Sequence, residues 1–305
     1  MKNKLFLLLI LLIILTACDL EIPADPFAIE GVTGSGSPTD SIEMEIVIPV
    51  SGQTVRSGQQ FEPTVVLSNK GDADSYGVVC MNLLDVNLFG ETCDCVGYDL
   101  FSANDLDLLT EDYFAFGPYT VSAERSSTQD ITFSNKFEYE TEAVAEVCII
   151  KDTISGDCKT TVGNREKNML DSNSKGPVRV SKVTESISPA TDYDTDFIFT
   201  IEISYNPGDG ERLYDLTYIL DQSCEVPTEM NKVVEVEAEL LGEELNCGSY
   251  EFDKNNEAVA TCTFTGITVV DSQGTQVITE EEQDLTINLR YAYQKTEGLQ
   301  FQVVA

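Results

Sequence analysis

The feature that most constrains this chain is a two-residue alternation of apolar and polar side chains. In one segment the apolar positions are Phe197, Phe199, Ile201, Ile203 and Tyr205. Residues 42–48, 234–240 and 285–293 repeat the pattern. Because successive side chains of a β-strand point to opposite faces, each segment predicts a strand with one buried and one hydrated face. Many short strands of this kind, separated by turn residues, predict an all-β protein built from antiparallel β-sandwiches.

A polar segment at residues 163–176, rich in Asn, Ser, Lys and Gly, divides the alternating pattern into two parts. We interpret it as a linker, because exposed polar segments commonly separate domains. The sequence therefore predicts two Ig-like β-sandwich domains, at residues 42–162 and 177–305. Asn104 to Tyr113 is the only segment that we consider as a helix.

The two regions share a strand–turn–strand motif. A strand beginning near Phe61 ends in the turn Asn69-Lys70-Gly71-Asp72, and a strand at Phe199 ends in Asn206-Pro207-Gly208-Asp209. We expect Gly71 and Gly208 to adopt positive φ angles and the two asparagine side chains to cap the turns.

This strand, Asn-x-Gly turn and second strand resemble the Ig-like modules of the CARDB type, which are common in archaeal and bacterial surface proteins. The resemblance covers mainly the first half of each region. It implies an Ig-like fold and no particular ligand. The layout of the chain as a whole resembles that of prokaryotic, archaeal cell-surface lipoproteins. A cysteine-containing insert near residues 85–115 departs from the pattern of the module.

The N-terminus has the layout of a secretory signal. Lys2 and Lys4 precede an apolar run from Leu5 to Leu15, which is shorter than the roughly 20 residues that span a bilayer. The run ends in Leu15-Thr16-Ala17-Cys18, which resembles the lipobox of prokaryotic lipoproteins. The resemblance implies that residues 1–17 are removed and that Cys18 carries the lipid. The alternative is a plain secreted protein with an ordinary cysteine at the cleavage point.

Residues 18–41 contain Pro and Gly and no Lys or Arg, and we interpret them as the lipidated cysteine followed by a flexible tether. Alternatively, the segment around Phe27–Ile29 docks on the first region as an edge strand. The expected location is extracytoplasmic, at the cell surface, with the protein anchored to the membrane through Cys18.

Eight cysteines remain after Cys18, at positions 80, 93, 95, 148, 158, 224, 247 and 262. Cys247 and Cys262 flank a turn at Asp253 to Asn256, so a regular hairpin would place them opposite each other and allow a disulfide. Cys148 and Cys158 flank a similar turn and form a second candidate pair. Because five cysteines lie in the first region and three in the second, either one disulfide joins the regions or each region keeps one unpaired thiol.

A zinc site at Cys93-Asp94-Cys95 is a competing interpretation. Structural zinc sites usually combine two cysteine pairs, and one C-x-C motif supplies only two ligands. We therefore predict disulfides rather than a bound metal, with inert buried thiols as a further alternative.

The chain carries 53 Asp and Glu against 18 Lys and Arg, a formal net charge of −35. This charge argues against nucleic-acid binding, which needs clustered cations. Asp105, Asp107, Glu111 and Asp112 are the candidate calcium ligands, because hard oxygen donors suit that ion. The competing interpretation is a hydrated acidic surface, since the acid excess is similar in the two regions. We expect no cofactor, and calcium at these carboxylates is the alternative.

Histidine and tryptophan are absent, and no phosphate-binding loop or nucleophile elbow occurs. These absences exclude a His-based triad and argue against an enzyme. We predict a non-enzymatic, lipid-anchored surface protein that binds or assembles with envelope proteins or glycans. The alternatives are a structural subunit of a surface layer or appendage and, less favoured, a carbohydrate-acting enzyme.

Overall fold

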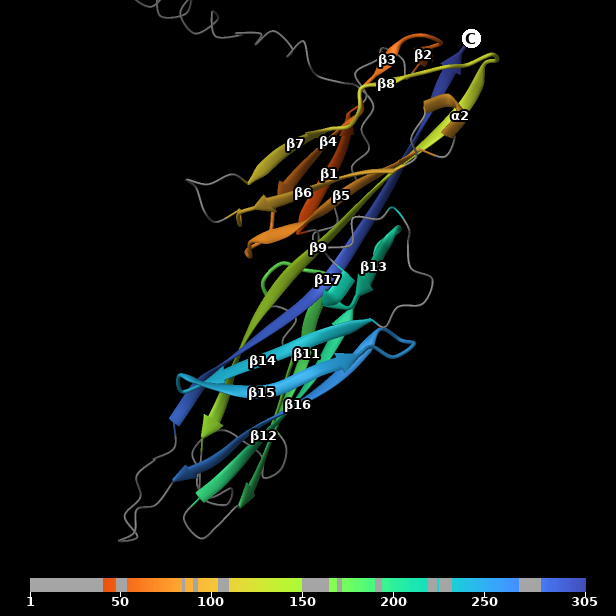
Figure 1. The fold of residues 1–305 in the computed structure, drawn as a ribbon. Helices are drawn as coiled ribbons and strands as arrows, with labels where there is room; N and C mark the ends of the chain where they lie inside the picture. Colours follow the sequence, from red (N-terminus) through yellow and green to blue (C-terminus); the bar gives the residue numbers. More distant parts are fainter. Residues whose placement is uncertain are drawn as a thin grey trace, which may run out of the picture. The chain divides into compact units, whose positions relative to one another are not determined.

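The structure is a computed structural model that describes residues 41–47, 54–83, 86–89, 93–103, 110–149, 165–168, 172–189, 194–218, 224, 232–268 and 281–305. Almost all regular structure in these residues is β-strand, and the main sheets are antiparallel (Figure 1). The predicted all-β sandwich class is confirmed. Two short helical turns also occur in this part of the chain, α2 (Val86–Phe89) and η3 (Leu216–Tyr218).

The largest sheet is built around two long strands, β9 (Ser127–Ile149) and β17 (Glu281–Val304), which run side by side in Figure 1. They pair antiparallel along their lengths, from Glu281 opposite Ile149 to Val303 opposite Ser127. The sheet, here called the β17 sheet, has the order β15-β14-β17-β9-β5-β6. The other four strands are β15 (Glu243–Glu251), β14 (Val233–Leu240), β5 (Ser75–Leu83) and β6 (Cys93–Leu100). Two further strands pair with β17, namely β13 (Glu211–Tyr214) and, in parallel, β2 (Thr54–Arg56).

Two smaller sheets and one short ladder complete the described fold. The β4 sheet contains β1 (Ile42–Val47), β4 (Thr64–Asn69) and β7 (Glu111–Ala115). The β12 sheet contains β10 (Arg165–Asn168), β11 (Val178–Pro189), β12 (Asp194–Tyr205) and β16 (Glu257–Thr268). The ladder pairs β3 (Gln60–Phe61) with β8 (Tyr119–Thr120).

Aromatic contacts show how the small sheets pack on the β17 sheet. The rings of Phe114 on β7 and Tyr98 on β6 lie 5.9 Å apart. The rings of Tyr205 on β12 and Tyr293 on β17 lie 6.4 Å apart. Such contacts join buried faces across a sandwich.

The buried side chains confirm the predicted alternation. In β12 every second residue from Phe197 to Tyr205 is buried, as are the alternating apolar positions from Val234 to Leu240 and from Leu285 to Tyr293. The helix considered at Asn104 to Tyr113 is wrong in its described part. Glu111 to Tyr113 belong to β7, because Phe114 buries one face of that strand against Tyr98 while its neighbours stay outside the core.

Strands of the two predicted domains share the β17 sheet. Residues 302–304 at the end of β17 pair with β2, whereas its earlier residues 285–290 pair with β14. One continuous cluster of buried apolar residues includes members of both regions. The division at 42–162 and 177–305 stays a prediction, and the pairing adds that the last strand of the second region also completes the sheet of the first.

The shared turn motif is present, although its glycines act differently from the prediction. The Asn69 Oδ1 atom accepts a hydrogen bond from the Gly71 N–H at 2.9 Å, so this asparagine caps its turn as expected. The expectation of positive φ at Gly71 and Gly208 is wrong, and Gly210 has that conformation instead, with φ 76°. At Gly71 a Cβ atom would lie 1.6 Å from the Tyr139 hydroxyl, so close approach of that side chain explains the glycine.

Both described parts of the predicted linker at 163–176 belong to the fold. Residues 165–168 form β10, which pairs with β11, and residues 174 and 175 make hydrogen bonds to the first region. The Ser174 N–H donates to the Glu142 carbonyl at 2.7 Å, and the Glu142 N–H donates to Ser174 Oγ at 2.9 Å. Next to it, the Lys175 N–H donates to Asp72 Oδ2 at 3.0 Å. Residues 174 and 175 therefore connect β9 with the Asn69–Asp72 turn of the first region.

Candidate functional surfaces and the cysteine cluster

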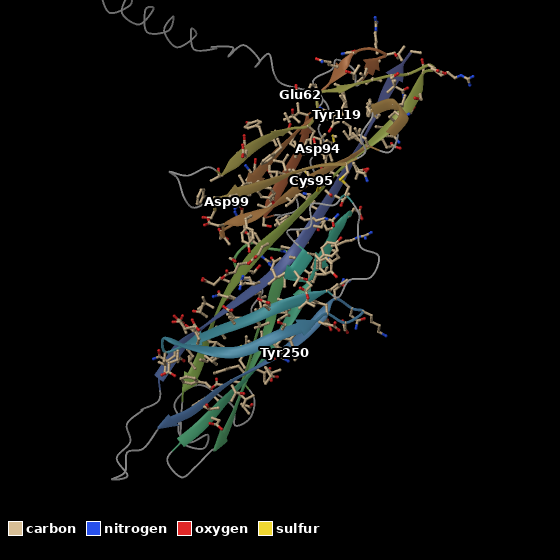
Figure 2. All side chains as sticks on the ribbon, viewed as in Figure 1. Glu62, Asp94, Cys95, Asp99, Tyr119 and Tyr250 are labelled. Carbon is tan, nitrogen blue, oxygen red and sulfur yellow. A yellow bond between two sulfur atoms is a disulfide. The ribbon has the colours of Figure 1, made fainter. Side chains whose placement is uncertain are left out.

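Four cysteines gather on one face of the β17 sheet. Cys80 on β5 lies directly opposite Cys95 on β6, and a disulfide joins them. Cys93 lies two residues before Cys95, on the same face of β6, and forms a disulfide with Cys224. The Sγ atoms of Cys93 and Cys95 are 3.9 Å apart, so the two disulfides are in contact. The region is found in Figure 2 by the labels of Cys95 and Asp94 on β6.

The Cys93–Cys224 disulfide joins the two regions of the chain, which was one of the two outcomes left open by the odd cysteine counts. No local sequence signal pairs these residues, which are 131 positions apart. Only the folded arrangement brings Cys224 to the β5–β6 edge of the sheet.

A disulfide also joins Cys247 and Cys262, the pair that the hairpin pattern selects. The geometry differs from the predicted ladder, because β15 belongs to the β17 sheet and β16 to the β12 sheet. The disulfide therefore crosses between the two sheets of a sandwich, and both cysteines are buried. Cys158 and the side chain of Cys148 lie outside the described residues, so that pair stays a prediction.

Of the four predicted calcium ligands, Asp105 and Asp107 lie outside the described residues. Glu111 and Asp112 lie on β7, where both carboxylates accept hydrogen bonds. Glu111 accepts from the Tyr113 hydroxyl at 2.5 Å and from Ser68 Oγ at 3.0 Å. The hydrogen bond from Tyr113, followed by that from Ser68, holds the pKa of the Glu111 carboxyl below its ordinary value. Calcium binding here stays a prediction.

Strand β7 ends the β4 sheet and displays an exposed aromatic ring. The Tyr113 side chain is 64% exposed, the largest fraction among the large apolar side chains of the described residues. Its hydroxyl is held by Glu111, and its backbone N–H donates to Asp112 Oδ1 at 2.8 Å. The Asp112 carboxylate therefore accepts the hydrogen bond of the Tyr113 N–H, a backbone donor on this terminal strand.

A second terminal strand, β16, is also covered by a side chain. The Tyr250 hydroxyl accepts a hydrogen bond from the Thr261 N–H at 3.1 Å and lies 3.3 Å from the Thr261 carbonyl oxygen. Tyr250 is labelled in Figure 2 near the junction of β15 and β16. Unpaired backbone groups at a sheet edge can pair with a strand of another chain. The Tyr250 hydroxyl hydrogen-bonds to such groups of Thr261 and so disfavours strand pairing at this edge of β16.

The outer face of β9, β17 and β14 is acidic. Arg290 on β17 lies between Glu140 on β9 and Glu235 on β14, and the next row places Asn288 between Glu142 and Glu237. The Arg290 guanidinium contacts Glu138 at 2.7 Å and Glu235 at 3.6 Å. Burial raises the pKa of the Glu140 carboxyl; Arg290 opposes this effect and neighbouring carboxylates add to it.

The predicted signal, the lipidation site Cys18 and the tether at 18–41 lie outside the described residues, so these stay predictions. In the part of the chain that the structure describes, no helix has the length and apolar character needed to cross a bilayer.

Comparison with known proteins assigns no family to this chain. No family model matches it, and no curated protein matches it. Among solved structures, a red sea bream transglutaminase is similar over 87% of this chain, with 9% sequence identity and a TM-score of 0.21. The chain covers 32% of that protein's length.

Proposed function

We propose that this protein is a non-enzymatic, lipid-anchored cell-surface protein that binds envelope proteins or glycans through side chains on its β-sandwich surface. The lipobox-like segment ending at Cys18 supports the anchor. Disulfides are typical of proteins outside the cytoplasm, and the three among the described residues support that location. The observation that carries the binding function is the exposed Tyr113 ring on the terminal strand β7.

Tyr113 is suited to contact a partner because its position is fixed before binding. The hydrogen bond to Glu111 restrains the phenol, and Ser68 in turn restrains the Glu111 carboxylate. A restrained aromatic side chain loses little conformational entropy on binding, and tyrosine is enriched in protein interfaces. Its flat apolar ring and polar hydroxyl also suit a glycan or a protein surface.

The covered strand edges favour binding through side chains over assembly by edge-to-edge strand pairing. On β7 the Tyr113 N–H donates a hydrogen bond to the Asp112 carboxylate, and on β16 the Thr261 N–H donates one to the Tyr250 hydroxyl. A structural subunit that polymerises through its edges needs such groups available. This is why we place the surface-layer or appendage subunit second.

The binding function is tested by capture from the native envelope after chemical crosslinking. We expect Tyr113→Ala to reduce the yield of crosslinked partner severalfold. Tyr218→Ala is the matched control, because Tyr218 is 41% exposed on η3, away from β7 in the sequence, and its loss should leave the yield unchanged. Equal yields of crosslinked partner from both variants would contradict the proposal that Tyr113 on β7 contacts the partner. Light scattering that shows long oligomers of the purified protein would favour the structural-subunit alternative.

The anchor is tested separately. Cys18→Ser should abolish lipid attachment and leave the protein unprocessed or shed into the medium. Detergent partitioning of the variant, compared with the unchanged chain, measures this effect. A Cys18→Ser protein that is still processed and partitions equally into detergent would contradict the lipoprotein assignment.

A further inference from the structure

The four-cysteine cluster is the feature that the proposed function does not use. The sequence supplied only the Cys93-x-Cys95 pair, which is too few ligands for a structural zinc site. The fold adds Cys80 from the opposing strand and Cys224 from a distant segment. We propose that, when these two disulfides are reduced, the four thiolates form a binding site for a soft divalent cation of the zinc type.

The first support is the position of the sulfur atoms. In a tetrahedral zinc–thiolate site with Zn–S bonds of about 2.3 Å, neighbouring sulfurs lie about 3.8 Å apart. The Sγ atoms of Cys93 and Cys95 already lie 3.9 Å apart. Those of Cys80, Cys95 and Cys224 all lie within 4.8 Å of one another. Reduction breaks both S–S bonds, so the sulfurs of each pair can move apart to this separation.

The second support is the way the backbone holds the donors. Cys93 and Cys95 lie on the same face of β6, and pairing with β5 fixes Cys80 opposite Cys95. Cys80 alternates along β5 with Val79 and Met81, which face the apolar core. The four sulfurs therefore lie on the other face of the β17 sheet, outside that core, where Cys80 is nevertheless only 1% exposed. Three donors thus remain in place on paired strands without any disulfide.

The third support is the chemistry of the donors. Thiolates select soft and borderline cations such as zinc over calcium or magnesium. On reduction the cluster supplies four thiolates, and the chain as a whole has a net charge of −35, which attracts cations. This proposal is independent of the proposed surface-binding function, because it concerns a different face and different residues from Tyr113.

The reaction balances with a dithiol as the reductant. Each disulfide accepts two electrons and two protons from one dithiol, which closes to a cyclic disulfide, so two dithiols release four cysteine thiols. Binding of one divalent cation then displaces four protons and forms four metal–sulfur bonds.

The test uses the full chain in detergent, reduced with a dithiol without oxygen and titrated with Co²⁺. We expect one Co²⁺ per chain with the visible bands of a tetrahedral thiolate site, lost on addition of Zn²⁺, and no such bands before reduction. Cys93→Ser and Cys224→Ser should each lose this spectrum. The double variant Cys247→Ser/Cys262→Ser is the matched control and should keep it, because it removes a disulfide elsewhere in the fold.

A second measurement needs no variant. Zn²⁺ should protect Cys80, Cys93, Cys95 and Cys224 of the reduced chain from alkylation, mapped by mass spectrometry, while Cys247 and Cys262 gain no protection. A reduced chain that takes up no Co²⁺ would overturn the proposal. So would alkylation at the four positions that is unchanged by Zn²⁺, or a cobalt spectrum that survives both Cys93→Ser and Cys224→Ser.

Discussion

The two sheets that enclose the core of the second region present different outer faces to solvent. Along β9, β17 and β14, carboxylates dominate, at Glu138, Glu140, Glu142, Glu235, Glu237 and Glu239. Across β11, β12 and β16 the corresponding positions are mostly uncharged, with rows that include Thr184–Thr200–Thr261 and Ser186–Ile198–Thr263. The first face is here called the acidic face and the second the threonine face. Strand pairing thus concentrates charge that the linear sequence spreads evenly, since residues 42–162 carry 21 acids and residues 177–305 carry 25.

Arg290 is the cation that lies among the carboxylates of the acidic face. Arg290 makes charged hydrogen bonds to Glu138, whose side chain is only 13% exposed. On the threonine face, Lys182 and Glu202 form a more exposed pair at 3.2 Å. Charged groups gain more from pairing when water is partly excluded, so one Arg on the acidic face should matter more than one Lys on the threonine face.

The largest expected loss of stability comes from removing the disulfide that links the two sheets bearing these faces. The Cys247–Cys262 disulfide joins β15 of the β17 sheet to β16 of the β12 sheet, across a sequence separation of 15. Replacing both residues by Ala should lower the free energy of unfolding by about 3 kcal/mol through the greater entropy of the unfolded chain. Urea unfolding under non-reducing conditions measures the loss. An unchanged midpoint would show that the sandwich does not depend on this link.

Arg290→Gln should have the next largest effect, because it leaves Glu138 and Glu235 without their cation. We expect a loss of about 1–2 kcal/mol in the free energy of unfolding. Lys182→Gln on the threonine face is the control, with an expected loss of no more than about 0.5 kcal/mol. Equal losses from the two variants, measured by urea unfolding at neutral pH, would mean that the faces do not differ in this respect.

The strands of both faces were predictable and their pairing was not. Alternation at residues 197–205 and 285–293 identifies the strands and their buried sides without the structure. Nothing in that alternation says that β17 lies between β9 and β14, because these pairings join residues that are far apart along the chain, such as Tyr291 with Tyr139 and Leu289 with Val236. The 23 residues of β9 also exceed the usual strand length, so its continuity follows from pairing with β17 along its whole length.

The cysteines show the same limit at the candidate site. Cys247 and Cys262 are close in sequence, and a local turn was enough to select them. Cys93 and Cys224 are joined by the fold alone, and no spacing rule connects them. Tyr113 was likewise missed, because it fell within the segment considered as a helix, where its exposure on a terminal strand could not be foreseen. Strand β7 is recognised only once β4 is seen to pair with it.

Neutralising Glu140 on the acidic face should raise stability slightly. Burial, with a smaller effect of neighbouring carboxylates, raises the pKa of Glu140 in the folded protein above its ordinary value, so folding favours its protonated form. The contribution of this group to stability is therefore complete below its unfolded pKa and is lost as the pH rises through the higher folded pKa. Glu140→Gln should gain a few tenths of a kcal/mol near pH 7, because the group is partly exposed. That gain should vanish in acid.

Glu202→Gln on the threonine face is the control for Glu140→Gln. Glu202 is paired with Lys182, so its neutralisation should give no gain at pH 7. Thermal unfolding of both variants at several pH values makes the comparison. A gain from Glu140→Gln that is equally large at pH 4 would contradict a titration origin.

The smallest expected effect is that of salt, and it compares the two faces most directly. Glu235, Glu237 and Glu239 point to one side of β14, so they repel one another where screening is poor. Added NaCl shortens the screening distance to about 10 Å at 0.1 M, so the melting temperature should rise by a few degrees. Replacing the three glutamates by Gln should remove part of that rise, whereas Glu202→Gln with Glu257→Gln on the threonine face should leave most of it. An equal rise in melting temperature in both variants would show that the repulsion does not come from the three glutamates of β14.

Micromolar calcium at constant ionic strength separates screening from specific binding, since only a bound ion gives a saturable rise in melting temperature. If such a rise appeared and Asp105→Asn with Asp107→Asn removed it, the predicted calcium site would account for the ion response in place of the acidic face.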